Sequence, residues 1–395
     1  MQPFTDIRVL DFTHVYAGPF ASFQLAAMGA EVIKIEAPNS PDMMRFEGVD
    51  SEANQRGLGS SYLFNNQGKK AICLNLESEE GRSIARKLIE SADVLLENYS
   101  AGLARFDLSA AQALAINPRL IYCEMTGFGR DNPSSGRPAY DPVIQAASGM
   151  MSLNGELDQD FLRVGPPLVD YGTGAQAAFA IASALFQRSK TGKGQIIEVN
   201  MFDAALMMMS PLLANAITSG KTDTRTGNVQ TEKPGYAIFR CAEDDIMIGA
   251  FTTGQHAKLF AALVIHELVE LPAKLSATWL SSHGEQLRQA IESRLAAKSA
   301  SDWEILLNQH DVPAARVRDL HEMLVSDQLL RAPSSQHRRI ESSPLTAPIA
   351  AFRFAEDGPK LDSRCARQGE DTDAVLTELG YTRDQLDMMK QQGII

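Results

Sequence analysis

The sequence predicts an α/β fold with a mostly parallel sheet. Short β-rich runs alternate with helical runs through the first half of the chain, and the first three, at 7–13, 18–30 and 31–38, form one β-α-β unit. Strands that alternate with helices favour a sheet covered by helices on both faces. The chain has 395 residues, which exceeds what one hydrophobic core ordinarily holds, so at least two domains are expected.

The alternation continues after the first unit. Residues 69–76 and 93–99 are predicted as strands, and an amphipathic helix that begins with Ser and acidic residues lies between them at 78–92. A helix at 110–118 then leads into a strand at 120–129.

The next part of the chain contains the segment 164–174, VGPPLVDYGTG. A polar loop at 153–162 precedes it, and an alanine-rich helix is predicted at 175–189. A turn, a strand and a Met-rich helix follow at 191–213, and such methionines are more typical of a core than of a ligand surface.

A polar, turn-rich segment at 219–233 is predicted as a linker into a second domain. The expected organisation is a large domain at 1–218, the linker, a small domain at 234–325 with strands at 237–241 and 245–251, and a return segment at 326–395 that ends in helix.

Composition excludes several classes of function. The formal charge of −12, from 49 acidic and 37 basic residues, argues against a nucleic-acid footprint or binding to an anionic membrane. The N-terminus has no signal-peptide pattern and no stretch of about 18 apolar residues occurs, so a cytoplasmic protein is expected. The four cysteines are far apart and indicate buried thiols in a reducing compartment, with no metal site.

Familiar catalytic motifs are missing. Glu36 ends the second predicted strand, where an acid could bind a ribose, but the preceding turn lacks GxGxxG, so an NAD-dependent dehydrogenase ranks low. There is no GxSxG and no GxxxxGK[ST]. HELVE at 266–270 has Glu270 where a zinc protease needs its second His, which favours a surface helix.

Asp170 has two competing interpretations. An Asp just before a helix can cap it, and near the helix N-terminus its carboxylate is expected to stay ionised. Thr173 offers another cap, however, and Gly172 and Gly174 are costly in a helix but allow backbone to approach a ligand closely. An ionised carboxylate in such a place can act as a nucleophile toward an acyl group. For Asp141, followed by Pro142, a capping role is favoured.

The ordered segments VLDFTHVYAGPFAS, GAEVIKIEAP, LLENYSAG, YDPVIQAASGMMS, PPLVDYGTG, TGKGQIIEVNMFDAAL and the C-terminal tail together resemble the family III CoA-transferases of the CaiB/BaiF type. That group includes formyl-CoA transferase, carnitine CoA-transferase and α-methylacyl-CoA racemase. The resemblance implies a large Rossmann-like domain formed by the N-terminal half and the C-terminal tail, a smaller α+β domain, and a homodimer of interlocked rings.

The same resemblance implies the site and its chemistry. Asp170 is the implied nucleophile, which forms a mixed anhydride with the donor acyl group and then an aspartyl-CoA thioester that a carboxylic acid attacks. Acyl-CoA is then a substrate, and no tightly bound cofactor is expected. Backbone N–H groups of Gly172 or of the loop with Gly249, Thr252, Thr253, Gly254 and Gln255 are candidates for stabilising oxyanions. The implied CoA-binding residues are His14, Val15, Tyr16, Ala17, Leu74, Asn75, Leu76, Asn98, Tyr99, Arg105, Arg137 and Tyr140.

Three alternatives to a transferase remain. A racemase or epimerase of the same superfamily needs proton-transfer groups at the α-carbon, but Tyr140 stands where the racemases have His, and the loop 249–255 contains no acid. A tyrosine with a pKa near 10 is a poor general base at neutral pH. A catalytically silent CoA-binding protein and an NAD-dependent dehydrogenase are less favoured still.

Overall fold

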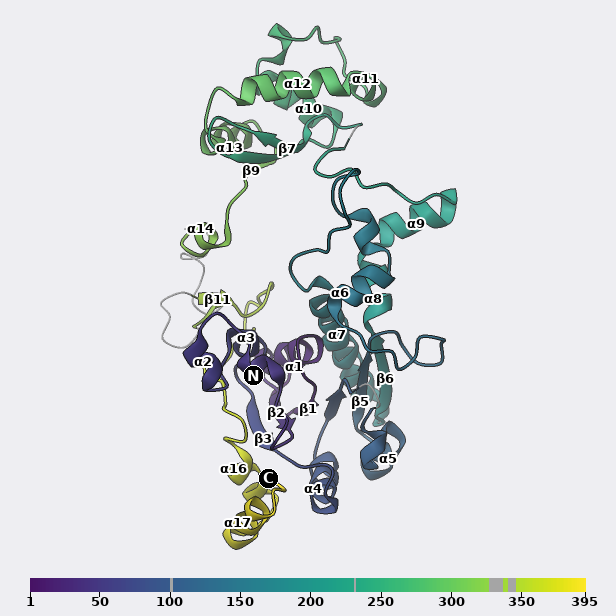
Figure 1. Cartoon of the computed structure of the whole chain (residues 1–395), viewed down its shortest axis with the longest axis vertical. Coiled ribbons are helices and arrows are strands. Elements are labelled where there is room, and N and C mark those ends of the chain that lie inside the picture. Colours follow the sequence, from purple (N-terminus) through teal and green to yellow (C-terminus); the bar gives the residue numbers. More distant parts are fainter. Residues whose placement is uncertain (100–101, 231, 327–336, 340–345) are drawn as a thin grey trace. The chain divides into compact units, whose positions relative to one another are not determined.

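The computed structural model describes the chain except for residues 100–101, 231, 327–336 and 340–345 (Figure 1). The chain divides into two compact units. Unit 1 comprises Met1–Met150, Arg163–Lys221 and Asp327–Ile395, and unit 2 comprises Met151–Leu162 and Thr222–Ser326. The segment Met151–Leu162 thus belongs with unit 2, whereas the sequence analysis placed it within 1–218.

Unit 1 contains a six-stranded sheet in which every paired strand is parallel. The order is β3-β2-β1-β4-β5-β6, so the chain moves outward from β1 to one edge and then from β4 to the other. This arrangement confirms the predicted α/β fold with a parallel sheet, and it puts a topological switch point between β1 and β4. The strands are β1 (Arg8–Phe12), β2 (Glu31–Glu36), β3 (Lys70–Cys73), β4 (Val94–Glu97), β5 (Ile121–Thr126) and β6 (Gln195–Asn200).

Each face of the sheet has its own core because side chains alternate along a strand. Val9 of β1 packs with residues of helices α1 (Ala17–Ala27) and α7 (Leu168–Thr191) on one face. Leu10 packs on the other with α4 (Glu79–Glu90) and the C-terminal helices. Figure 1 shows helices on both sides of the strands.

The C-terminal segment completes unit 1. Asp371 and Thr372 accept hydrogen bonds from the backbone N–H groups of Ala71 and Cys73, so they cover the outer edge of β3. Helices α16 (Thr372–Glu378) and α17 (Arg383–Gln391) add Leu376 and Leu386 to the core.

The other elements of unit 1 connect successive strands or follow β6 in the chain. They are η1 (Met43–Phe46), α2 (Ser51–Gln55), α3 (Ser60–Asn66), η2 (Leu103–Phe106), α5 (Ala110–Ile116), α6 (Asp141–Ala147), α8 (Met201–Met208), α9 (Ser210–Ser219) and the strand pair β10 (His337–Arg339) and β11 (Thr346–Pro348). Within the described ranges, no single helix is long and apolar enough to cross a membrane; by length and composition only the pair α8 and α9 qualifies, and it is bent by 80°.

Unit 2 is built on an antiparallel sheet in the order β7-β8-β9. Its core brings Phe239 and Ile248 of the sheet together with Leu259 and Trp303 of the helices. HELVE, predicted as a helix, forms only the short 3₁₀ turn η4. The elements are β7 (Tyr236–Arg240), β8 (Asp245–Gly249), α10 (Thr253–Ala262), η4 (Ile265–Glu267), α11 (Ala277–Ser282), α12 (Gly284–Leu295), α13 (Ala300–Gln309), β9 (Ala314–Arg316) and α14 (Leu320–Leu324); η3 (Met150–Leu153) lies where the chain enters the unit.

Candidate active site

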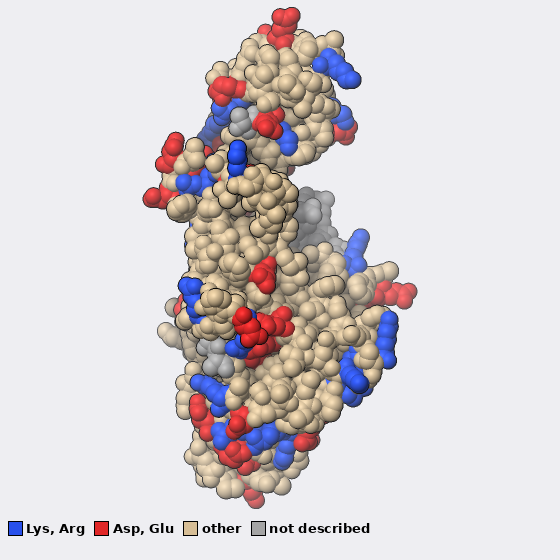
Figure 2. Space-filling view, turned by 90° about the vertical axis from the view of Figure 1, so that its right-hand side faces the viewer, with Lys and Arg blue, Asp and Glu red and all other residues tan. Residues whose placement is uncertain are grey.

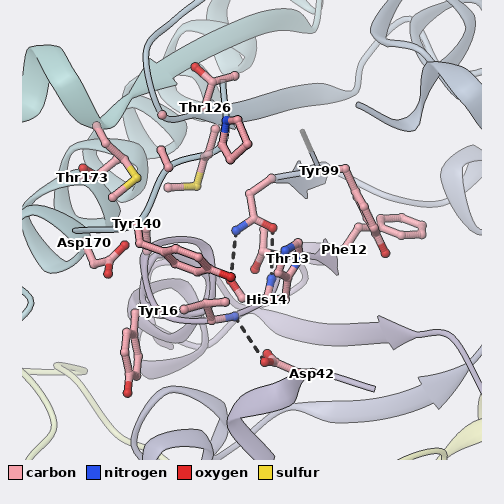
Figure 3. Close-up of a pocket in the computed structure, with 18 of the residues that line it drawn as sticks. Phe12, Thr13, His14, Tyr16, Asp42, Tyr99, Thr126, Tyr140, Asp170 and Thr173 are labelled. Atoms are coloured by element: carbon pink, nitrogen blue, oxygen red, sulfur yellow. Dashed lines mark hydrogen bonds between the residues drawn. The ribbon is translucent and has the colours of Figure 1, made fainter. Parts of the chain in front are cut away.

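A cavity of about 490 Å³ opens at the carboxyl ends of β1, β2, β4 and β5 (Figure 3). It therefore spans the switch point between β1 and β4, which is where ligands bind in open parallel sheets. We call it the first cavity. Of the residues expected to bind CoA, it is lined by His14, Val15, Tyr16, Ala17, Asn98, Tyr99, Arg137 and Tyr140, and Asp170 lies in the same wall.

The loops after β1 and β4 are joined directly across the switch point. The backbone N–H of His14 donates to Oδ1 of Asn98 at 3.0 Å, and Nδ2 of Asn98 donates to the carbonyl of His14 at 2.9 Å. The His14 ring also lies 5.5 Å from that of Tyr99, measured between ring centroids. These contacts fix the two loops as one wall of the cavity.

Asp170 lies inside helix α7, which corrects the predicted helix start at residue 175. The helix begins at Leu168, so Asp170 is in the first turn, and its own backbone N–H donates to Oδ2 of Asp141 at 3.0 Å. No hydrogen bond in which the Asp170 side chain caps the helix is found within the described residues. Asp141 is likewise the first residue of α6, after Tyr140, and so does not cap that helix. The Asp170 side chain instead lines the first cavity.

The protonation of Asp170 also differs from expectation. Burial raises the pKa of its carboxyl group, and the neighbouring Asp141 raises it further, to about 7. The side chain is only 7% exposed. Close to neutral pH the group is therefore divided between its acid and its carboxylate form, where the sequence analysis expected full ionisation. A carboxylate with a raised pKa is more basic and hence a stronger nucleophile once deprotonated.

The two glycines that follow Asp170 serve packing. A Cβ atom on Gly174 would lie 2.5 Å from the carbonyl oxygen of Ala17, so its absence lets α7 and α1 approach closely. On Gly172 it would lie 2.7 Å from Cε of Met208. Because Gly172 is past the first turn of α7, its N–H is used within the helix and cannot stabilise an oxyanion. An oxyanion contact from backbone N–H groups around Gly172 therefore stays a prediction that the helix does not favour.

Four residues expected to bind CoA do not line the first cavity. Leu74 and Leu76 are buried in the core of unit 1, and Asn75 bonds to the backbone of Ile394 and Gly393 near the C-terminus. The Arg105 guanidinium stacks over Phe106 and lies 3.5 Å from Glu77. For these positions the core or surface interpretation fits the structure better.

The sequence analysis missed other lining residues, among them Thr13, Asp42, Thr126, Arg130 and Met201. Most of them directly follow a parallel strand or lie in the loop after it. The signal that could have identified them is the strand ends themselves, because parallel strands present all their carboxyl ends at one edge.

Glu36 is not free to bind a ribose. Its carboxylate forms a buried ion pair with Arg45, with Nη2 and Oε2 2.5 Å apart, and the same guanidinium donates to the Tyr62 hydroxyl. The acidic residue that would read an NAD ribose is thus neutralised inside the protein, which removes the main support for a dehydrogenase.

The loop 249–255 belongs to unit 2 and is held by hydrogen bonds at both of its ends. Gly249 ends β8 and donates to the carbonyl of Pro313 at 2.7 Å. Thr252 and Gln255 form a reciprocal capping box at the start of α10, which leaves Thr253 and Gly254 in the first helical turn. Only the N–H groups of Thr253 and Gly254 remain as candidates for an oxyanion contact, and that role stays a prediction.

Among the residues that the structure describes, no cluster of three or more His, Cys, Asp or Glu side chains could hold a metal ion. All four cysteines are free thiols, and burial raises the pKa of Cys123 to about 12, so that thiol stays protonated.

Comparison with known proteins identifies the family. The model described as CoA-transferase family III matches residues 4–372. The chain belongs to CoA-transferase family III. It is accordingly an enzyme that transfers CoA and uses acyl-CoA as a substrate.

Relatives with named activities match most of the chain. A succinate–glutarate CoA-transferase of Agrobacterium fabrum is 29% identical over 95% of this chain and 96% of its own. An acetyl-CoA:oxalate CoA-transferase of Acetobacter aceti is 33% identical over 81% of this chain and 82% of its own. The crystal structure of a CAIB/BAIF family protein from Brucella suis superposes with a TM-score of 0.83 at 30% identity, covering 96% of this chain and 99% of that one.

Proposed function

We propose that this family III CoA-transferase uses Asp170 as its nucleophile and binds the CoA moiety in the first cavity. The observation that carries the proposal is the position of Asp170: a largely buried carboxylate that lines a cavity at the sheet's switch point and does not cap its helix. His14, Tyr16, Asn98, Tyr99 and Tyr140 supply the surrounding wall.

The reaction starts when an Asp170 oxygen attacks the thioester carbonyl of the donor. The C–S bond breaks, CoA leaves as thiolate, and a mixed anhydride joins Asp170 to the donor acyl group. The thiolate then attacks the Asp170 carbonyl carbon, the donor acid is released, and an aspartyl-CoA thioester remains. Each covalent intermediate retains the activation of the thioester, so no ATP is required.

The acceptor acid then undergoes the same steps in reverse order. Its carboxylate attacks the Asp170 carbonyl carbon and displaces the CoA thiolate, and the thiolate attacks the acceptor acyl carbon to form the new acyl-CoA and regenerate the Asp170 carboxylate. The N–H groups of Thr253 and Gly254 are our candidates for stabilising the oxyanions.

A short dicarboxylic acid is the acceptor class that we propose. The relatives described above are named for succinate, glutarate and oxalate. Arg137 offers a compatible anion contact: its guanidinium stacks on Phe128 and lines the cavity, and no ion pair of this residue is found among the described residues.

The functional protein is, in our proposal, a homodimer of interlocked chains. Exposed apolar side chains of α7 and α9 support it, since Phe179, Phe186 and Ile217 are 71%, 64% and 74% exposed. Figure 2 faces the side of unit 1 that carries β6, α8 and α9 and shows few charged side chains over much of it. Exposed apolar side chains on a surface with few charges are typical of a protein interface.

Trapping with hydroxylamine tests the nucleophile. The protein is incubated with succinyl-CoA, glutaryl-CoA or oxalyl-CoA and hydroxylamine, and intact mass and peptide mapping follow. An activated aspartyl group becomes a hydroxamate about 15 Da heavier, and we expect this change at residue 170. Asp170→Asn should lose the mass change and lower CoA exchange by about 10³-fold or more, while Asp131→Asn, an exposed residue outside the cavity, should keep both. A hydroxamate at another residue, or exchange retained by Asp170→Asn, would refute the assignment.

A further inference from the structure

The turn after β1 has a strained backbone. Val15 adopts a φ of +70°, a left-handed conformation that β-branched residues rarely take. Val15 lies in the wall of the first cavity, between His14 and Tyr16. Strain of this kind persists only where surrounding contacts enforce it, and at a ligand site it points to a functional cause.

The contacts that hold this turn come from three directions. The backbone N–H of Val15 donates to Oδ1 of Asp42 at 3.2 Å, and Asn98 binds His14 through the pair of hydrogen bonds described above. Lys34 reaches from β2 and donates to the carbonyl of Thr13 at 2.7 Å. Figure 3 shows the hydrogen bond from the turn to Asp42.

Lys34 and Asp42 are themselves a buried ion pair. Lys34 Nζ lies 3.1 Å from Oδ2 of Asp42, and the two side chains are 0% and 1% exposed. Burial alone would lower the pKa of Lys34, but the neighbouring carboxylates of Asp42, Asp11 and Glu36 outweigh it and raise that pKa, so Lys34 is charged. Buried ion pairs stabilise a fold less than apolar packing does. Stability alone therefore does not explain why this pair is present.

We propose that Lys34 and Asp42 are positioning residues whose ion pair holds Val15 in its strained conformation and so fixes the loop 14–17 that receives CoA. The pair binds the turn at both ends: Lys34 donates to the carbonyl of Thr13, and Asp42 accepts from the N–H of Val15. Without the pair, the strain at Val15 favours relaxation to an ordinary backbone conformation, and His14 and Tyr16 move with it. This inference rests on the proposed placement of CoA in the first cavity.

Asp42→Asn tests the inference because it removes the charge and keeps an oxygen that can accept from Val15. We expect the KM for the acyl-CoA donor to rise about tenfold with a smaller change in kcat, as relief of strain at one residue supports. The Val15 amide hydrogen should also exchange with solvent deuterium faster than in the unaltered protein.

A second substitution separates positioning from general stability. Glycine adopts positive φ without strain, so Val15→Gly placed in the Asp42→Asn protein should restore both the KM and the protection of the turn. Val264→Gly is the matched control, because Val264 also has a positive φ, of 55°, but belongs to unit 2 and does not line the cavity. It should raise the melting temperature in the same background without restoring the KM.

Each outcome either supports or overturns the inference. Rescue by Val15→Gly and not by Val264→Gly supports the inference, and equal rescue by both overturns it, because the defect would then be one of overall stability. An unchanged KM and unchanged exchange in Asp42→Asn also overturn it. Faster exchange of the turn with an unchanged KM overturns it by a different route, since the pair would hold the turn while CoA binds elsewhere; hydroxamate formation on Asp170 would still test the nucleophile independently.

Discussion

The side-chain carboxylate of Asp141 accepts a hydrogen bond from the backbone N–H of Asp170 at 3.0 Å, while its other oxygen accepts from Nε2 of Gln145. The start of α7 is thereby tied to α6 by a buried negative charge. That charge acts on the proposed nucleophile: after burial, Asp141 is the cause that raises the pKa of Asp170 to about 7.

This relationship predicts a pH dependence for the first half-reaction. Attack on the thioester needs the carboxylate, so the rate of aspartyl acylation should rise with pH and level off above about 7. Asp141→Asn should move this rise in rate to lower pH, because the repulsive charge beside Asp170 is gone. Burial still keeps the pKa of Asp170 above the ordinary value of an Asp. Single-turnover rates between pH 5 and 9 measure the shift, with Asp131→Asn as control. A rise in rate that stays at the same pH in Asp141→Asn would show that another group sets it.

The contribution of Asp170 to the stability of the fold should fall as pH rises, whereas the rate of acylation rises. The pKa of Asp170 is raised in the folded protein to about 7 from an unfolded value near 3.9. The folded state therefore holds this proton more tightly, so the group's contribution is fully present below pH 4 and is lost as pH rises toward 7, by at most about 1.4 kcal/mol per pH unit.

Asp170→Asn isolates that contribution, since the amide does not titrate. The free energy of unfolding of this variant minus that of the unaltered protein should increase as pH rises from 4 to 7 and then stay constant, because only the unaltered protein loses the contribution of Asp170. Denaturant unfolding at several pH values measures the difference. A constant difference across this range would mean that Asp170 has an ordinary pKa.

Tyr140 offers a test of the CoA pocket. Its side chain is 57% exposed and lines the cavity. Tyr140→Phe should raise the KM for acyl-CoA by about 3- to 10-fold, as expected for loss of one hydrogen bond to a ligand, with kcat nearly unchanged. A collapse of kcat with unchanged CoA affinity would instead assign Tyr140 to the chemistry.

The sequence predicted the parallel sheet well because its signal is local. Runs such as 31–38 and 93–99 are β-rich and bounded by helical runs, and each became a strand of the sheet. The start of α7 was predicted seven residues late, since Gly172 and Gly174 have low helix propensity. Their place in the helix is decided by close packing against α1 and Met208, which local propensity does not contain.

The candidate site, like the fold, could be predicted only in part from the sequence. His14, Asn98 and Asp170 follow from family motifs, and the structure brings them to one cavity. The pKa of Asp170 could not be predicted, because it depends on burial and on Asp141, 29 positions earlier in the chain. For Leu74 and Leu76 the place after a strand suggested a ligand contact, whereas the structure buries both in a core with the C-terminal helices, so their contact with CoA stays a prediction.

The two glycines after Asp170 give the last prediction, because they differ in what a methyl group would meet. On Gly174 the new atom would lie 2.5 Å from a backbone oxygen of α1, which cannot move without shifting the helix, whereas on Gly172 it meets the flexible end of Met208. Gly174→Ala should therefore destabilise the protein by about 1–3 kcal/mol and lower CoA exchange, because α1 begins at Ala17, which lines the cavity that we propose to receive CoA. Gly172→Ala should change stability by less than about 1 kcal/mol, since better helix propensity offsets the displaced methionine. Melting curves and CoA-exchange rates of the two variants, measured side by side, test this packing role. If both glycines instead bring backbone N–H groups to the ligand, the two variants should lose activity equally without losing stability.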